Sequence, residues 1–388
     1  MIDSLAVIPA PDPIPLPAQP GLLRALLIFT FILHLFPMNL TLGGSFLTAW
    51  TDWRGRKAGC ARRRALVEYL AHVLPTATAY TITLGVAPLL FLQVLYGQMF
   101  YTSSVLMAWP WLTIIPLLVI GYYGLYLYAL RREWLGRRSP LVGGVSALAF
   151  LVIGFLYTNN MALMLAPARW YGIYRSDPTG LHLNLGDPTV IPRFLHFFLA
   201  AVAFTGVFIA IHGLSLLKRG DTEQGRYTVR YGGLWFAAPT IAQFVVGPWY
   251  LFSLPPHVRD IFLGGDIVAS AHLWGGVAFA LAALMLIVIA FNAPDPRRLV
   301  LAGAGCLVLA IVSMAVARNA VREATLAPYF RVMDLPAAPQ TGVILLFFAL
   351  LAGAIVVIAT MLKWMRVENT PPPSPPLQEG RGENQEAR

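Results

Sequence analysis

Long hydrophobic stretches separated by short polar connections run along the chain from about residue 21 to residue 364. Each stretch is close to or above the roughly 20 residues that an α-helix needs to cross a bilayer. Lipid offers the backbone no hydrogen-bond partners, so such stretches fold as helices. The pattern predicts an all-α integral membrane protein, a nine-helix transmembrane bundle. The predicted helices cover residues 21–50, 67–97, 105–130, 141–166, 190–217, 232–254, 267–291, 299–317 and 341–364.

The composition agrees with this class. Of the 388 residues, 57% are hydrophobic and 12% are charged, whereas soluble domains carry about 25% charged residues. So few charges cannot cover a soluble globule of this length. The net charge of +10 would indicate an acidic partner such as a nucleic acid in a soluble protein, but the positions of the basic residues give it another meaning.

Basic residues gather in alternate connections between the predicted helices. Four connections contain more than half of the 28 Lys and Arg residues, and the connections between them contain few. This is the positive-inside pattern, which predicts an outer N-terminus and a cytoplasmic C-terminus. The charge is therefore a topology signal, and no nucleic-acid partner is expected. The residues are Arg54, Arg56, Lys57, Arg62, Arg63 and Arg64; Arg131, Arg132, Arg137 and Arg138; Lys218, Arg219, Arg226 and Arg230; and Arg297 and Arg298.

The two ends differ from the hydrophobic region. Residues 1–20 are rich in proline and predict an extended outer arm, residues 21–366 form the membrane domain, and the polar, Pro-rich residues 367–388 predict a disordered cytoplasmic tail. Cys60 and Cys306 lie in a cytoplasmic connection and inside a helix, so no structural disulfide is expected. No C-x-x-C-H motif is present, so any haem would be bound without thioether bonds.

His196 and His212 stand near the two ends of the stretch 190–217. About 24 Å of helix separates them, and their side chains point roughly 160° apart. We therefore expect different roles. His212, close to Lys218, is expected to lie at the cytoplasmic interface, as is His72 near Glu68 at the inner end of the second helix.

Three other histidines lie within the predicted membrane helices, where polar side chains are candidates for function. His196 and His272 lie at a similar shallow depth on two helices that enter from the outside, so the pair could ligate one haem iron. The alternative is that each bonds a neighbouring carbonyl or water. His34 lies near the middle of the first helix, which predicts a cofactor or a buried polar partner.

Four segments carry a resemblance to subunit I of the cytochrome bd quinol oxidases, over residues 21–364. They are "HLFPMNLTLGGSF", "LGVAPLLFLQVLYGQMF", "YGLYLYALRREW" and "LNLGDPTVIPRFLHFFLAAVAFTGVFIAIHGLSLLKRG". The resemblance implies the bacterial cytoplasmic membrane and a related, subunit II-like membrane partner. It also implies that His34 is an axial ligand of the oxygen-site haem and that His196 is a ligand of the low-spin haem b.

Departures from the family pattern fall at positions of function. The acidic residues expected on the second and third helices appear as Gln93 and near Val119. The glutamate expected on the eighth helix is replaced by Asn319 or Arg318. The methionine partner of the low-spin haem is missing, which leaves His272 close by. The outer loop that the family uses for quinol shrinks to "SLPPHVRDIFLGGD".

These losses argue against an intact oxygen-reducing centre, because carboxylates usually deliver protons to such buried sites. We therefore expect a haem b-binding electron-transfer subunit of a respiratory complex, an oxidoreductase subunit that passes electrons between quinone and a periplasmic redox partner. Two alternatives remain open: a divergent terminal quinol oxidase subunit, and a haem-free membrane anchor or scaffold.

Arginines on the outer side are unfavourable by the positive-inside rule, so a specific use is expected for them. We predict that Arg318 or Arg322 neutralises a haem propionate or a quinone-site charge, and that a cytochrome c or iron–sulfur subunit docks nearby. The alternative is that the outer arginines cap helices and hold lipid phosphates. They are Arg169, Arg175 and Arg259, with Arg318, Arg322 and Arg331 after the eighth helix.

Overall fold

The computed structural model describes residues 8–9 and 14–368, so nearly all of the predicted tail and much of the predicted arm lie outside the described residues. The described residues are almost entirely helical. The helices are α1 (Pro20–Ala58), α2 (Ala61–Leu106), α3 (Ala108–Leu112), α4 (Ile114–Leu130), α5 (Arg132–Leu135), η2 (Gly136–Arg138), α6 (Ser139–Met164), α7 (Pro167–Ser176), α8 (Val190–Lys218), α9 (Thr222–Ser253), α10 (Pro256–Asp260), η3 (Ile261–Gly265), α11 (Ile267–Ala290), α12 (Arg297–Leu326), η4 (Val332–Asp334) and α13 (Thr341–Glu368).

Every predicted segment is helical, and among the described residues seven helices are long and apolar enough to cross a membrane. They are α1, α2, α3 with α4, α5 with α6, α8, α11 and α12. The all-α membrane class is therefore confirmed. That α9 and α13 also cross, which would make nine spans, stays a prediction.

The described chain divides into two units. The larger, called the bundle unit here, contains α1 to η4 and ends at Pro336. The second contains Leu16–Gln19 and the chain from Ala337 onward. In this second unit the amide of Ala338 donates to the Leu16 carbonyl at 2.9 Å. Part of the predicted arm is therefore hydrogen-bonded to the segment that leads into α13.

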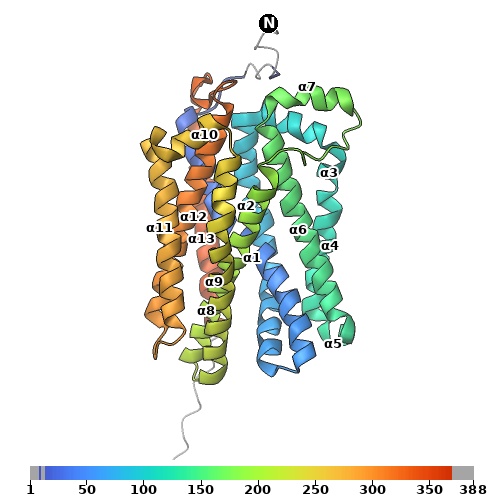
Figure 1. The fold of residues 1–388 in the computed structure, drawn as a ribbon, viewed down its shortest axis with the longest axis vertical. Helices are drawn as coiled ribbons and strands as arrows, with labels where there is room; N and C mark the ends of the chain where they lie inside the picture. Colours follow the sequence, from blue (N-terminus) through green and yellow to red (C-terminus); the bar gives the residue numbers. More distant parts are fainter. Residues whose placement is uncertain (1–7, 10–13, 369–388) are drawn as a thin grey trace, which may run out of the picture. The chain divides into compact units, whose positions relative to one another are not determined.

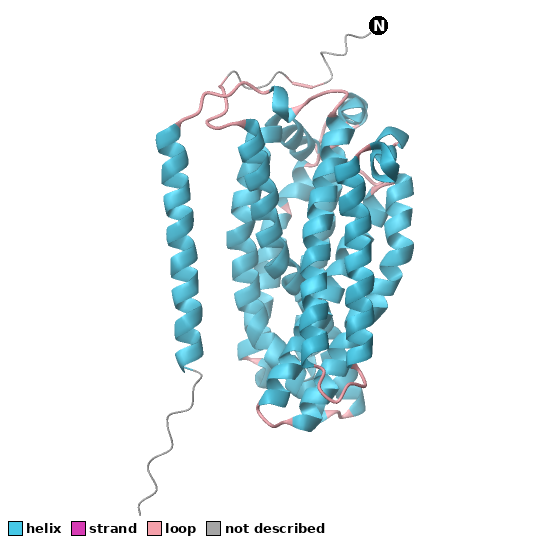
Figure 2. Cartoon of the chain, turned by 90° about the vertical axis from the view of Figure 1, so that its left-hand side faces the viewer, coloured by secondary structure: helices cyan, strands magenta, loops and turns pink. Residues whose placement is uncertain are grey.

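Within the bundle unit the long helices run side by side (Figures 1 and 2). The connections predicted to be cytoplasmic gather at one end, called the basic end here. Arg62 of α2 forms an ion pair with Glu223 of α9, and Arg226 donates to the Pro294 carbonyl at 3.1 Å. α7 and α10 lie at the opposite end, called the outer end. The grouping of the loops agrees with the predicted topology, while the orientation in a membrane stays a prediction.

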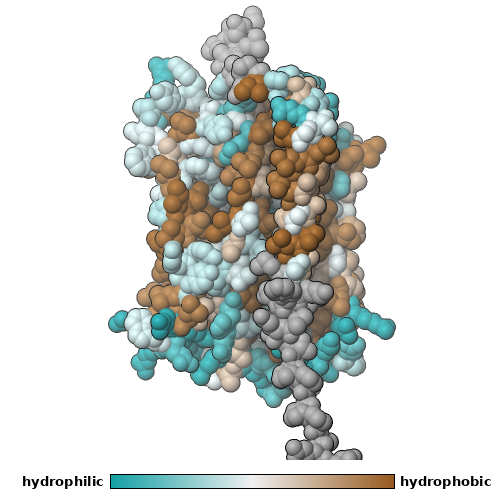
Figure 3. Space-filling model, turned by 180° about the vertical axis from the view of Figure 1, so that it is seen from behind, coloured by the Kyte–Doolittle hydropathy of each residue, from teal (hydrophilic) through white to brown (hydrophobic). Residues whose placement is uncertain are grey.

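Exposed apolar side chains cover the sides of the helices between these two ends. Figure 3 shows a hydrophobic band with polar residues above and below it on the face drawn. Among the exposed residues are Val86, Leu90, Ile115, Met285 and Ile289. Contiguous apolar surface of this kind is unusual for a soluble protein and is what a lipid-facing bundle requires.

Glycines set the spacing between α8 and α9. A Cβ atom on Gly206 would lie 2.4 Å from the Phe236 backbone nitrogen, and one on Gly232 would lie 2.5 Å from the Ala210 nitrogen. Gly213 makes the same close approach to Val229, at 2.6 Å. Any side chain at these positions would push the two helices apart. Small residues are the usual means by which helices pack closely in lipid, where no hydrophobic driving force brings them together.

α1 crosses α8 at a similarly short distance. A Cβ on Gly43 would lie 2.1 Å from the Ala201 carbonyl oxygen. One turn away, the Thr205 hydroxyl donates to the Asn39 carbonyl at 3.4 Å. These contacts centre the α1–α8 crossing near residues 41 and 203, which provides a reference level for the side chains nearer the outer end.

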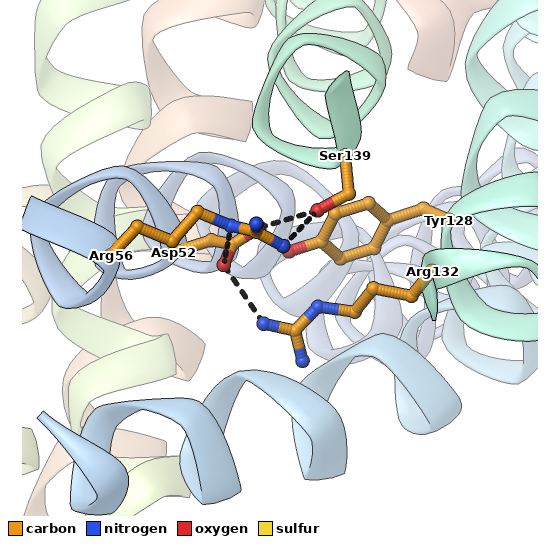
Figure 4. Close-up of polar contacts among 5 residues, drawn as sticks. All are labelled: Asp52, Arg56, Tyr128, Arg132 and Ser139. Atoms are coloured by element: carbon orange, nitrogen blue, oxygen red, sulfur yellow. Dashed lines mark hydrogen bonds and ion pairs between the residues drawn. The ribbon is translucent and has the colours of Figure 1, made fainter. Parts of the chain in front are cut away.

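A buried carboxylate ties α1 to α4, α5 and α6 near the basic end (Figure 4). Asp52 is 2% exposed and accepts hydrogen bonds from Arg56 Nε at 3.0 Å and Arg132 at 2.8 Å. It also accepts from the Tyr128 hydroxyl at 2.9 Å and the Ser139 hydroxyl at 3.0 Å. Four donors thus compensate the burial of one charge.

Replacing Asp52 with alanine should destabilise the bundle by about 3 kcal/mol, because it leaves the partly buried Arg132 without its counter-ion. The midpoint of denaturant-induced unfolding in detergent measures this. Asp260→Ala, which removes a mostly exposed carboxylate at the outer end, is the control and should change the midpoint little. Equal effects of the two substitutions would contradict a structural role for the Asp52 network.

Candidate functional site

His34 and His196 lie at one depth in the bundle unit. His34 stands about 10 Å from the α1–α8 crossing toward the outer end, and His196 stands about 10 Å from it in the same direction. Both distances follow from the helix rise and the contacts of Gly43 and Asn39 with α8. The two imidazoles therefore lie at the same level on neighbouring helices, closer together in depth than the sequence pattern indicated.

His272 belongs to the same layer. The depths of His272 and His34 can be compared through α12, which contacts both of their helices. Arg318 of α12 lies over the Phe31 ring of α1 at 4.3 Å, and Gly276 of α11 faces Ser313 and Met314 of α12. Counting along these antiparallel helices places His272 opposite residue 317 and His34 opposite residue 315. The difference is about two residues, or 3 Å. Three histidines on α1, α8 and α11 thus share one layer in the outer half of the bundle.

Two of these imidazoles have no hydrogen-bond partner on one ring nitrogen. The Nδ1 atoms of His34 and His196 are both buried and unpaired. Each ring faces a glycine: a Cβ on Gly85 would lie 3.1 Å from His34 Nδ1, and one on Gly247 would lie 3.9 Å from His196 Nδ1. Buried polar atoms are nearly always satisfied, and an exception calls for an explanation such as a missing ion or cofactor.

The other two membrane histidines have partners within the protein. His72 Nδ1 lies 2.8 Å from the Glu68 carbonyl oxygen. His212 stacks on Tyr69, with ring centroids 3.5 Å apart and an angle of 7° between the ring planes. Their interfacial roles stay predictions, and these partners distinguish His72 and His212 from His196, while His34 combines an unpaired Nδ1 with a hydrogen bond to the Thr81 backbone.

His272 and His196 are on helices that both pack against α9. Toward the basic end, α8, α9, α11 and α12 share one core cluster that includes Val207, Phe236, Ile287 and Val300. His196 and His272 lie beyond this cluster, in the outer half of the same four helices, and both are only partly buried. The structure thus places the pair in one helix group and at nearly one depth.

Three arginines collect beside this layer, on α8 and α12. Arg193 is 8% exposed and Arg322 is 5% exposed, and the Nε atom of each has no hydrogen-bond partner. Arg318 is close enough to both for their charges to repel. Among the described residues, no carboxylate forms an ion pair with any of the three.

Aromatic faces take the place of counter-ions in this arginine cluster, made of Arg193, Arg318 and Arg322. The guanidinium carbons lie 5.2 Å from the Tyr250 ring centroid, 4.3 Å from that of Phe31 and 4.7 Å from that of Tyr96, respectively. Cation–π contacts offset part of the desolvation of a guanidinium, by about 2 kcal/mol each. Among the described residues the nearby Glu323 is paired with Arg24 rather than with a member of the cluster, so the three positive charges of the cluster are close together without an ion-paired carboxylate.

The predicted place of two of these arginines was wrong. Arg318 and Arg322 were expected in an outer loop after a helix that ends at residue 317, but α12 continues to Leu326. The hydropathy signal ends at the first charge, whereas the helix continues because its polar side chains turn inward. Asn319 is 6% exposed and accepts a hydrogen bond from Arg322.

Gln93 and Val119, the other two positions where acidic residues were expected, differ in their exposure. Gln93 is partly buried and accepts a hydrogen bond from Tyr101 at 3.3 Å. Val119 is 50% exposed on an outward face of α4. The absence of a carboxylate at Val119 therefore says nothing about the interior, so the argument for a degenerate site rests on Gln93 and Asn319.

The outer-end arginines outside the cluster either form ion pairs with aspartates or are exposed to solvent. Arg169 lies 3.6 Å from Asp187, and Arg259 lies 3.8 Å from Asp260. Arg175 and Arg331 are exposed. Arg169 and Arg259 therefore have counter-ions within the chain.

A polar loop that sequence reasoning missed fixes the start of α8. Asp187 accepts hydrogen bonds from the Thr189 amide at 2.8 Å and from the Thr189 hydroxyl at 2.7 Å. The Asn184 amide donates to Asn159 of α6 at 2.9 Å. Nearby, burial lowers the pKa of His182 below its usual value, with Arg169 adding to the effect. This loop holds the first turn of α8, which contains Arg193, and His196 follows in the second turn.

Neither a protein-family model nor a curated protein sequence matches the chain. Among solved structures, the chain is similar to one from the bd oxidase of Geobacillus thermodenitrificans, with a TM-score of 0.74 and 13% sequence identity. The match covers 91% of this chain and 99% of that chain. The chain therefore has the fold of a bd oxidase membrane chain, as the motif resemblance predicted, with a widely diverged sequence.

Proposed function

We propose that the chain is a haem b-binding electron-transfer subunit of a respiratory membrane complex, which passes electrons between quinone and a periplasmic redox partner. The observation that carries the proposal is the layer of His34, His196 and His272 beside an arginine cluster without carboxylates. The bd oxidase fold supports it, because a bd oxidase is an electron-transfer enzyme.

The residues present fit a low-spin haem b on α8. His196 has an unpaired nitrogen and faces Gly247, and His272 on α11 is the second ligand we propose. Bound there, a haem would exchange single electrons between its ferric and ferrous states. The chain's own part is to hold two imidazoles at one depth, to exclude water with the surrounding apolar helices, and to place positive charge nearby. His34, which faces Gly85, is the ligand we propose for a second haem.

The arginine cluster has the chemistry that haem propionates require. Arg binds carboxylates through paired N–H donors, and the Nε atoms of Arg193 and Arg322 have no partner within the protein. We therefore assign Arg318 and Arg322 to a haem propionate or to a quinone-site charge near the outer end. Arg193 is a third member of this set, which sequence reasoning did not include.

The oxygen-reducing function is proposed to be degenerate. Gln93 and Asn319 are neutral, and both are already engaged by Tyr101 and Arg322, so neither can carry a proton to a buried oxygen site as a carboxylate would. The second candidate function is a divergent terminal quinol oxidase subunit, which the fold of the Geobacillus oxidase favours. Partners proposed for either case are a related subunit II-like membrane chain and, for the first, a periplasmic cytochrome c or iron–sulfur subunit at the outer end.

His196→Ala should abolish a b-type α-band in the reduced-minus-oxidised spectrum of the purified complex, because it removes an axial ligand. His212→Ala is the matched control, since that ring is on the same helix but stacks on Tyr69, and it should keep the band. A pyridine haemochrome assay on both variants counts the haems. An unchanged spectrum in His196→Ala would refute the site.

Purified complex should show no haem d band and negligible quinol oxidase turnover, because Gln93 and Asn319 stand where the family has ionisable carboxylates. Oxygen uptake with a soluble quinol, with and without cyanide, measures this. Cyanide-sensitive uptake well above background would favour the quinol oxidase alternative.

Arg318→Gln and Arg322→Gln should each lower the midpoint potential of the outer haem, since removing a nearby positive charge disfavours the reduced, less positive state. The expected shift is on the order of 50–100 mV for a charge in a partly buried site. Redox titration measures it, with the exposed Arg175→Gln as control. If all three variants leave the potential where it is, the cluster does not face a haem.

A further inference from the structure

A second region with cationic side chains lies at the basic end, far from the histidine layer. It is a cavity of about 430 Å³ between the end of α8 and the start of α12, a volume within the usual range for small-ligand sites. Its lining residues are Ile211, Leu214, Ser215, Leu217, Lys218, Asp295, Arg297 and Leu301.

The charged and the apolar lining residues lie at different depths in the bundle unit. On α8, Leu214 lies one turn before Lys218, and on α12, Leu301 lies one turn after Arg297. Because α8 ends and α12 begins at the basic end, both cations are at the rim and both leucines are about 6 Å deeper in the bundle. The cavity is therefore charged at the membrane boundary and apolar toward the membrane interior.

The two cations lack counter-ions. Within the described part of the chain, neither Lys218 nor Arg297 forms an ion pair. Asp295 is the one carboxylate in the lining, and its Oδ1 accepts from the Arg297 backbone amide at 3.0 Å, so it caps the start of α12. The rim thus retains net positive charge, and the positive end of the α12 dipole adds to it.

We propose that this cavity binds one anionic phospholipid of the adjacent leaflet. The lipid phosphate lies between Lys218 and Arg297, and the first part of an acyl chain lies along Leu214, Leu217 and Leu301. A free phosphate would match the rim but leave the leucine wall without a partner. A phospholipid fits both the cationic rim and the leucine wall, because its phosphate lies at the membrane boundary and its acyl chains lie deeper in the membrane. Basic pockets between membrane helices are known sites for such headgroups.

Native mass spectrometry of the full-length complex tests the site, with phosphatidylglycerol and phosphatidylcholine as probes. The double variant Lys218→Gln/Arg297→Gln should bind phosphatidylglycerol about tenfold more weakly, since each membrane-surface cation contributes attraction to anionic lipid. The control Arg137→Gln/Arg138→Gln removes two exposed charges from η2, outside the cavity, and should bind as the wild type does. Equal losses in the two double variants would mean general surface charge and would overturn the proposal.

A third variant separates a lipid from a soluble anion. Leu301→Asn should weaken phosphatidylglycerol binding by removing the apolar wall while leaving both cations in place. If inorganic phosphate displaces phosphatidylglycerol and Leu301→Asn has no effect, the site binds a free anion and the lipid assignment is wrong. The haem spectrum should be unchanged in all these variants, so the outcome is independent of the proposed electron-transfer function.

Discussion

Close approach of α1, α8 and α9 is the constraint on which the rest of the bundle unit depends. In lipid, helices gain little by covering apolar side chains, so their association relies on surfaces that fit at short range. Gly43, Gly206 and Gly232 provide such surfaces, because a Cβ at any of them would lie 2.5 Å or less from backbone atoms of the neighbouring helix. The positions of α1, α8 and α9 follow from contacts that admit no larger residue.

This close packing of α1, α8 and α9 positions the side chains of the candidate site. His196 and Arg193 project from α8, and Gly247 and Tyr250 face them from α9, so the glycine contacts that join these helices also set their separation at the site. His34 depends in the same way on α1, whose crossing with α8 is held at Gly43. Two imidazoles at one depth are therefore a consequence of backbone contacts some 10 Å away toward the basic end.

The sequence predicted the membrane class, the helical segments and the candidate histidines, because hydrophobic length and the rarity of buried imidazoles are local signals. It did not predict the end of α12, where Arg318 and Arg322 continue a helix whose polar residues turn inward. The Asp52 network could not be predicted from the sequence either, since Asp52, Tyr128 and Ser139 come together only through the packing of three helices. The place of Arg193 in the arginine cluster could not be predicted, because its neighbours Arg318 and Tyr250 are distant in the sequence.

The charges of buried arginines are compensated differently at the two ends of the bundle unit. At the basic end, Arg56 and Arg132 both reach Asp52, so burial is compensated within the chain. At the outer end, Arg193 and Arg322 are more deeply buried than Arg132 is, and among the described residues they contact aromatic rings and Asn319 but form no ion pair with a carboxylate. Cation–π contacts of about 2 kcal/mol each do not offset several kcal/mol of desolvation per ion together with mutual repulsion. In the proposed function an anion outside the chain supplies the missing stabilisation, and the place of the arginine cluster beside His34 and His196 is why we propose that this anion belongs to a cofactor.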